Sequence, residues 1–192
     1  MKIKGKRIGF SLTGSFYTLK NTIEEMKKIV NMGGEIIPIM SPFTYNTNTK
    51  LEETKEYINK IEKISKRKII KSITETEKLI SKENIDIMVI APCTGNTLAK
   101  ITNGISDTSV TTAAKAYLRN NIPVLIGISA KDGLSTNAEN IAKLLNRKHI
   151  FFIPFKQNNP ITKPYSLSFD SKYITKSIEY ALENEQIQPI LL

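Results

Sequence analysis

The chain has 192 residues, of which 40% are hydrophobic and 24% are charged, and this predicts one globular domain. It has neither a signal-peptide pattern nor a long apolar run, so we expect a cytoplasmic protein that makes no membrane contact. One cysteine excludes an intrachain disulfide, and one cysteine with one histidine disfavours a structural zinc site, so no metal is expected. The net charge of +10 comes from scattered lysines, and no RNA-binding or helix-turn-helix pattern occurs, so no nucleic-acid partner is expected.

Strands and helices alternate along the chain. Continuous apolar runs predict buried strands, and apolar residues spaced three and four apart predict helices. In chain order we expect strand 7–12, helix 19–31, strand 35–40, a polar loop at 46–48, helices 51–65 and 74–81, strand 86–91, helices 96–104 and 109–120, strand 123–128, helix 135–146, strand 149–154, a polar loop at 157–168, helix 173–184 and an apolar tail at 189–192. The alternation predicts an α/β domain over residues 1–192 with a three-layer, doubly wound, mostly parallel sheet.

The end of the first strand carries Thr13, Gly14 and Ser15. A tight turn with hydroxyls and free backbone N–H groups at a helix N-terminus can bind phosphate. The alternative interpretation is an ordinary helix N-cap. Ser41 and Thr44 close the second strand, where they either complete a phosphate site or form a simple Ser-Pro turn.

The end of the third strand carries the most informative stretch, Ala91–Thr97. Open α/β sheets bind ligands beyond the carboxyl ends of their strands, and this stretch lacks bulky side chains, so a flat ring could approach its backbone. Asn96 offers a donor and an acceptor to such a ring, or it caps the following helix. Cys93 is either a neighbour of the ring or a small buried residue, and nothing nearby in sequence lowers its pKa.

Two further segments and one histidine also allow either a functional or a structural interpretation. Asp107–Thr112 could line the crevice, but helix capping is the favoured interpretation. The loop at 157–168 is long enough to be a functional flap, and its Lys163, together with Lys156, could bind an anionic substrate or simply be solvated. His149 is expected to be structural.

The segments Ile8–Lys20 and Ala91–Thr97 resemble the two signatures of the flavoprotein family that contains cysteine decarboxylases and prenyl-flavin synthases. The resemblance implies a Rossmann-like flavoprotein fold with FMN as cofactor, and homo-oligomers. It implies an FMN phosphate site at Thr13, Gly14, Ser15, Ser41 and Thr44, and a flavin ring against Pro92, Cys93, Thr94, Gly95, Asn96 and Thr97. Asn96 would then belong to the reaction centre.

A narrower resemblance runs nearly end to end. The chain is similar to the flavoprotein-like B subunit of a two-subunit oxidoreductase from the mother cell of spore-forming bacteria. The residues that carry it lie at 4–10, 89–92, 94–96, 113–116, 118–124, 127–129, 140, 150–155, 163–164 and 188–191. The resemblance implies dehydrogenation of a small dicarboxylate, to which Lys163 would be a cationic partner, and an A subunit that supplies NADP. No Gly-x-Gly-x-x-Gly follows the first strand, in agreement with a nicotinamide site on another polypeptide.

The chain departs from the decarboxylases in two places. It has no histidine between the second and third strands, and no cysteine in the substrate-clamp segment 127–140. Decarboxylation is therefore disfavoured, although a decarboxylase-like flavoprotein and a non-catalytic scaffold subunit remain the alternative hypotheses.

Overall fold

The computed structural model describes residues 2–14, 16–46 and 51–192. Ser15 and most of the predicted loop at 46–48 lie outside the described residues. The strands are β1 (Arg7–Leu12), β2 (Glu35–Met40), β3 (Ile87–Thr94), β4 (Val124–Ala130), β5 (Ile150–Phe152), β6 (Phe155–Gln157) and β7 (Leu167–Phe169). The helices are α1 (Phe16–Asn31), α2 (Pro42–Asn46), α3 (Leu51–Ser65), α4 (Ile73–Lys82), α5 (Gly95–Thr102), α6 (Ser109–Arg119), α7 (Ala138–Leu145) and α8 (Ile174–Ala181), with a 3-10 turn at Ser171–Tyr173.

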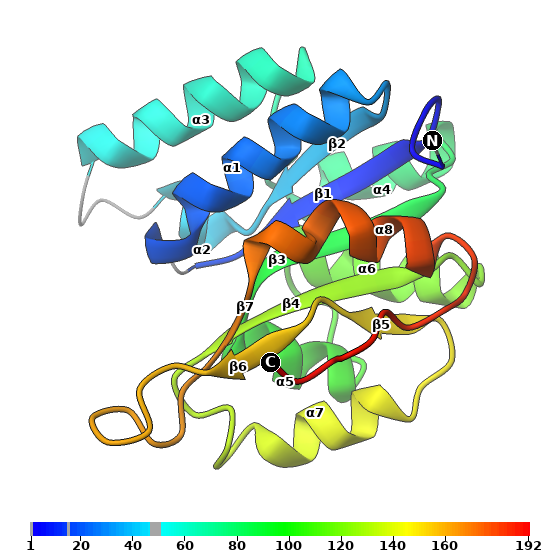
Figure 1. Ribbon diagram of the computed structural model, residues 1–192. Coiled ribbons are helices and arrows are strands. Elements are labelled where there is room, and N and C mark those ends of the chain that lie inside the picture. The colour runs from blue at the N-terminus through cyan, green and yellow to red at the C-terminus, as the bar shows by residue number, and fades with distance from the viewer. Residues whose placement is uncertain (1, 15, 47–50) are drawn as a thin grey trace.

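A parallel sheet in the order β2-β1-β3-β4 forms the centre of the molecule (Figure 1). β5 pairs in parallel with the first half of β4, and β7 pairs antiparallel with its end, at Ser129 and Ala130. β6 adds to β7 as a second antiparallel strand. The predicted mostly parallel α/β sheet is confirmed.

Helices cover both faces of the sheet, in agreement with the three predicted layers (Figure 1). α1 packs against α3 and α8 on one side, and α4, α5, α6 and α7 form the other layer. β1 to β4 are almost entirely buried because their apolar runs are covered on both faces. Within the described residues, no helix combines the length and the apolar character that crossing a bilayer requires.

Local sequence explains where several helices begin and end. Ser72 caps α4 in a capping box with Glu75, and Thr108 caps α6 in a capping box with Thr111. The capping interpretation of Asp107–Thr112 is therefore confirmed. The chain leaves α1 through Gly33, whose φ of 84° is strained for residues with a side chain.

The largest differences from the sequence prediction lie after residue 148. The expected strand 149–154 is shorter, because β5 ends at Phe152, and β6 follows beyond its expected end, at Phe155. Both ends of the expected loop at 157–168 are strands, so only 158–166 is the loop of a β-hairpin. The apolar tail lies beside β6, where Phe155 N–H donates to Ile190 O at 3.0 Å. Three-residue strands are too short to show a hydrophobic period.

The amino ends of the central strands are joined by an ion network. Arg7 contacts Glu83 at 2.6 Å, and Arg67 donates to both carboxylate oxygens of Glu83 at 3.0 Å. Arg67 also pairs with Glu35 at the start of β2. The hydrogen bonds from Arg67 and then from Arg7 hold the pKa of Glu83 below its usual range, against the opposing effect of burial.

This network predicts a defined pH dependence of stability. A lowered carboxyl pKa in the folded state contributes stability above the unfolded pKa, and that stability is lost as the pH falls through the folded pKa. Glu83→Gln should therefore lower Tm more at pH 7 than at pH 3.5, where the wild-type carboxylate is itself being protonated. Thermal melts at both pH values check this. An equal loss at both would show that the charge of Glu83 is not the cause.

Candidate functional site

The candidate site begins where β1 and β3 end side by side. The chain continues from β1 to β2 on one side and returns to β3 on the other, so a topological switch point lies between β1 and β3. Thr13, directly after β1, is buried and bridges to β3. Its hydroxyl donates to Pro92 O at 3.0 Å and accepts from Thr94 N–H at 3.0 Å. Its own N–H also donates to Pro92 O, at 3.1 Å. Thr13 therefore fixes the two strand ends relative to each other.

The end of β2 is tied to the same turn by two buried hydroxyls. Gly14 N–H donates to Thr44 Oγ1 at 2.6 Å, and Thr44 Oγ1 lies 2.7 Å from Ser41 Oγ. A Cβ at Gly14 would lie 2.6 Å from Thr94 Cγ2, and its φ is +34°, so a side chain here meets both steric and backbone strain. The structure thus brings Thr13, Gly14, Ser41 and Thr44 together as predicted, with their hydroxyls bonded to one another and to the backbone.

The second predicted turn begins inside β3. The β3–β4 register shifts between Ile90 and Cys93, and the Ala91–Pro92 peptide is cis. Thr94 caps α5, because its side chain accepts from Thr97 N–H at 3.4 Å. The cap is therefore Thr94 and not Asn96, which corrects that alternative. Asn96 is exposed, and within the described residues its side-chain amide forms no hydrogen bond.

The buried residues of this turn are Ala91, Pro92, Cys93 and Thr97. Cys93 has no exposed surface and lies opposite Ile128 in the sheet, so it is the small buried residue of the second interpretation. Burial raises the pKa of its thiol. Only Thr94, Gly95 and Asn96 of the turn present surface to a ligand.

A cleft of about 980 Å³ opens beside Thr94 and Gly95. Its opposite wall is the hairpin 158–166, with Lys163 among the lining residues. The full lining is Thr18, Thr94, Gly95, Ser129, Ala130, Lys131, Asn158, Asn159, Thr162, Lys163, Pro164, Tyr165, Ser166, Leu167 and Ser168. The structure therefore brings Thr94 and Gly95 of the predicted turn and the predicted flap lysine to one cleft. Asn96, the next residue of the turn, and Lys156 on β6 are exposed but are not among the lining residues.

Lys131 is a cleft residue that the sequence prediction missed. It directly follows β4, so the rule that ligands bind beyond the carboxyl ends of strands applies to it as to Thr13 and Thr94. The prediction ended this strand at residue 128, and Lys131 then fell inside an unassigned loop. The sequence prediction also missed Asn158, which directly follows β6, because no sequence pattern predicted that strand.

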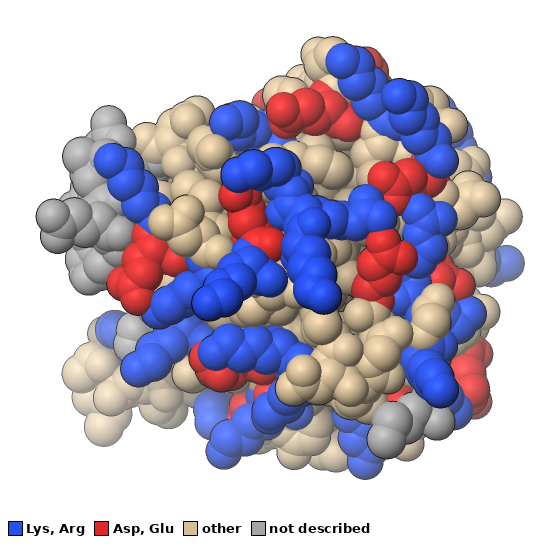
Figure 2. Space-filling view, turned by 90° about the horizontal axis from the view of Figure 1, so that it is seen from above, with Lys and Arg blue, Asp and Glu red and all other residues tan. Residues whose placement is uncertain are grey.

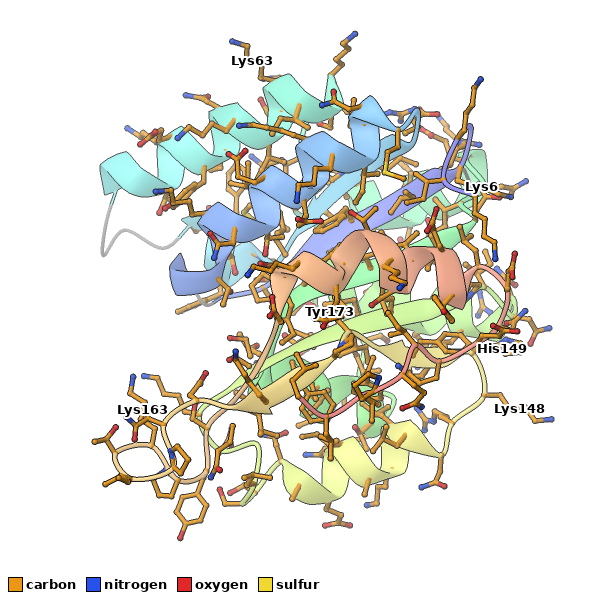
Figure 3. All side chains as sticks on the ribbon, in the orientation of Figure 1. Lys6, Lys63, Lys148, His149, Lys163 and Tyr173 are labelled. Atoms are coloured by element: carbon orange, nitrogen blue, oxygen red, sulfur yellow. The ribbon has the colours of Figure 1, made fainter. Side chains whose placement is uncertain are left out.

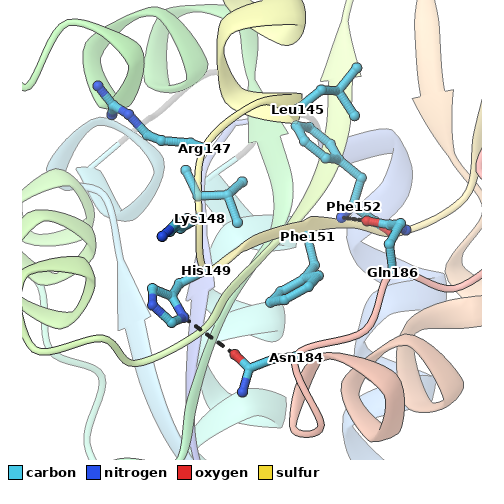
Figure 4. Close-up of a pocket in the computed structure, with 9 residues that line it drawn as sticks. Leu145, Arg147, Lys148, His149, Phe151, Phe152, Asn184 and Gln186 are labelled. Atoms are coloured by element: carbon cyan, nitrogen blue, oxygen red, sulfur yellow. Dashed lines mark hydrogen bonds between the residues drawn. The ribbon is translucent and has the colours of Figure 1, made fainter.

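His149 lies at the other end of the sheet, far from Lys163 (Figure 3). It lines a separate pocket of about 430 Å³ with Arg147, Lys148 and Asn184 (Figure 4). Its Nδ1 lies 3.3 Å from Asn184 Oδ1, and the Arg147 guanidinium donates to carbonyls at the end of α5. These contacts agree with a structural role for His149. Among the described residues, no group of three histidine, cysteine or acidic side chains could hold a metal.

Basic side chains outnumber acidic ones on the face over α1 and α3, and acidic side chains lie between them (Figure 2). Ion pairs within α1 join Lys27 to Glu24 and Lys28 to Glu25. Mixed charges of this kind are typical of solvated helix faces.

The chain belongs to the flavoprotein family, whose model matches residues 1–172. It is 43% identical to the B subunit of dipicolinate synthase from Bacillus subtilis (strain 168), over 99% of this chain and 95% of that protein. The crystal structure of the B subunit of dipicolinate synthase from Bacillus halodurans superposes with a TM-score of 0.91 at 41% identity, covering 100% of this chain and 98% of that one. An FMN-dependent cysteine decarboxylase, SpaF, shares the fold with a TM-score of 0.66 at 19% identity, covering 94% and 97%.

The bridge made by Thr13 leads to a direct test. Thr13→Val removes the hydroxyl and leaves Thr94 N–H without this acceptor, so we expect a loss of about 1–3 kcal/mol in the free energy of unfolding. Thr13→Ser keeps the hydroxyl and should lose much less. Urea denaturation of the three proteins measures the difference. Equal stability of Thr13→Val and wild type would contradict the role given to this side chain.

Proposed function

We propose that this chain is the B subunit of a dipicolinate synthase. It would act with an NADP-binding A subunit, in the mother cell during sporulation, to oxidise a dihydrodipicolinate-type precursor to dipicolinate. The observation that carries this proposal is the 43% identity to the Bacillus subtilis B subunit along essentially the whole length of both chains. The structure of the Bacillus halodurans B subunit also superposes closely on this chain, with a TM-score of 0.91. We further expect the chain to form homo-oligomers.

The cleft at the strand ends has properties that suit FMN. Its volume of about 980 Å³ lies within the range of small-molecule sites, about 300–1,000 Å³. Thr94 and Gly95 form one wall, and a side chain at Gly95 would collide with Asn137, whose Nδ2 would lie 2.6 Å from the added Cβ. The next residue, Asn96, has an exposed amide free to bond the polar edge of a ring. When bound, FMN would supply a two-electron carrier at the cleft, with NADP⁺ on the A subunit as the final acceptor.

The phosphate end of such a cofactor would lie near the turn after β1. The hydroxyls of Thr13 and Thr44 already hold the strand ends together, so we assign them a positioning role there. Direct phosphate contacts would then come from the start of α1, because helix N-termini carry unpaired N–H donors. Ser41 supports the same turn through Thr44.

The proposed oxidation removes a hydride and a proton from a dihydropyridine ring. The hydride would pass to NADP⁺, held by the A subunit, while the proton would pass to a base, giving the aromatic pyridine dicarboxylate and NADPH. Since aromatisation favours this step, the protein mainly has to orient the substrate. In this chain, Lys163 would bind a substrate carboxylate through a charge-assisted hydrogen bond, and Asn96 would orient the ring.

The alternative of an FMN-dependent decarboxylase has less support. The single histidine of the chain, His149, lies at the amino end of β5 beside Asn184. The single cysteine, Cys93, is fully buried. Neither can serve as an acid, base or nucleophile in the cleft as it stands.

Reconstitution tests the proposal. The chain and the A subunit from the same organism, mixed with the dihydropyridine dicarboxylate and NADP⁺, should form NADPH and dipicolinate, while either polypeptide alone should be inactive. Asn96→Ala should lower the rate about tenfold or more, because one orienting hydrogen bond is lost. The absorbance of NADPH and of the aromatic product reports both effects.

Asn59→Ala is the matched control, because Asn59 is an exposed asparagine on α3, whose amide forms no hydrogen bond within the described residues. It should keep full activity. Full activity of the A subunit without this chain would overturn the proposal, and an unchanged rate in Asn96→Ala would instead favour a scaffold role for this turn.

A further inference from the structure

The hairpin and the turn after β4 are joined into one unit beside the cleft. Leu134 N–H donates to Tyr165 O at 2.9 Å, which ties the turn to the hairpin. Gly133 packs so closely on β7 that an added Cβ would lie 2.8 Å from Leu167 Cγ. The backbone positions of residues 131–134 and 163–167 are therefore fixed relative to each other.

The hairpin is itself well ordered by internal hydrogen bonds. Asn159 Oδ1 accepts from Ile161 N–H at 3.0 Å and from Thr162 N–H at 2.9 Å, and Lys163 N–H donates to Asn159 O at 2.8 Å. Asn158 donates to Ser166 Oγ at 2.7 Å across the loop. Lys163 thus projects from a preformed segment.

Two lysines line the cleft, Lys131 on the turn and Lys163 on the hairpin, and no acidic residue is among the lining residues. Both are exposed, and within the described residues neither forms an ion pair. Asp132, the nearest acid in sequence to Lys131, accepts a hydrogen bond from Asn137 Nδ2 at 2.8 Å, and its Oδ1 would lie 2.8 Å from a Cβ added at Gly95. Lysines on α5 and α7, by contrast, are paired, as Lys100 is with Asp107 and Lys143 with Glu139. Two lysines without an ion pair in the described residues thus line one cleft from connected segments.

We infer that Lys131 is the second substrate-binding cation, and that Lys131 and Lys163 each bind one carboxylate of a small dianion. The rest of the lining supplies hydroxyls and amides, which suit a compact polar ligand. A ligand with a single carboxylate leaves one ammonium group unpaired, so the pair selects dicarboxylates over monocarboxylates. This inference rests on the proposed function, since it defines how that substrate class is recognised.

Ligand binding to the full chain, with and without added FMN, tests the inference in the absence of the A subunit. The probes are pyridine-2,6-dicarboxylate and pyridine-2-carboxylate, measured by isothermal titration calorimetry. We expect the dicarboxylate to bind at least about tenfold more tightly. Lys131→Gln and Lys163→Gln should each lose about tenfold or more in affinity for the dicarboxylate and less for the monocarboxylate, which can pair with the remaining lysine. The affinity for the dicarboxylate should also fall as salt is raised.

The control is Lys63→Gln, because Lys63 is exposed on α3 at the far side of the molecule from Lys163 (Figure 3). It should bind both probes like wild type. Since Lys131 and Lys163 are also exposed, none of the three substitutions removes core packing, and circular dichroism checks that each variant is folded.

The outcomes separate this inference from the proposed function. Unchanged dicarboxylate affinity in Lys131→Gln, equal affinity for the two probes, or no binding of either would overturn the inference, even if reconstitution with the A subunit succeeds. Lysine-dependent binding of the dicarboxylate without oxidation in the reconstituted system would support the inference and contradict the proposed function.

Discussion

The hydroxyl of Thr13 joins β1 to β3 at the point where the sheet changes direction. It donates to Pro92 O and accepts from Thr94 N–H, so both ends of the Ala91–Thr97 turn depend on one buried side chain. Once the turn is fixed, Thr94 can cap α5 and place Asn96 at the surface. The same constraint aligns Gly14 against Thr94 and thereby sets the wall of the cleft.

The two ends of the sheet differ in how their charged side chains are paired. At the amino ends, Arg7, Arg67 and Glu83 pair their charges with one another, so this end is stabilised by contacts within the chain. At the carboxyl ends, Lys131 and Lys163 line the cleft and have no such partners within the described part of the chain. Under the proposed function, these charges are left for an anionic ligand.

Sequence patterns predicted the central fold well because buried parallel strands are continuous apolar runs. The bounds of β1 and β2 agree with the prediction, and β3 extends further because Cys93 and Thr94 pair with Ile128 and Ser129 of β4 after a register shift. β6 and β7 were not predictable from periodicity, since each has three residues in a polar, proline-bearing stretch. Tertiary pairing with β4 and with the chain terminus forms these strands.

In the candidate site, too, features that depend on tertiary contacts could not be predicted from sequence patterns. Positions at strand ends could be predicted, and Thr13, Gly14, Ser41, Thr44 and Thr94 do meet there. The hydrogen-bond partners of those hydroxyls could not be predicted, because a pair such as Thr13 and Pro92 is 79 residues apart in sequence. Lys131 was missed for a related reason. Its place in the cleft depends on contacts with a hairpin whose strands no local sequence pattern predicted.

The most direct test of a ligand site at the carboxyl ends of the strands is an NMR titration of the ¹⁵N-labelled chain with FMN. Binding in the cleft predicts that the amide resonances of Gly14, Thr94, Gly95 and Asn96 shift in a saturable way, while those of Lys148 to Phe152 stay in place. Shifts confined to residues 148–152 at the opposite end, or no saturable shift at all, would contradict it.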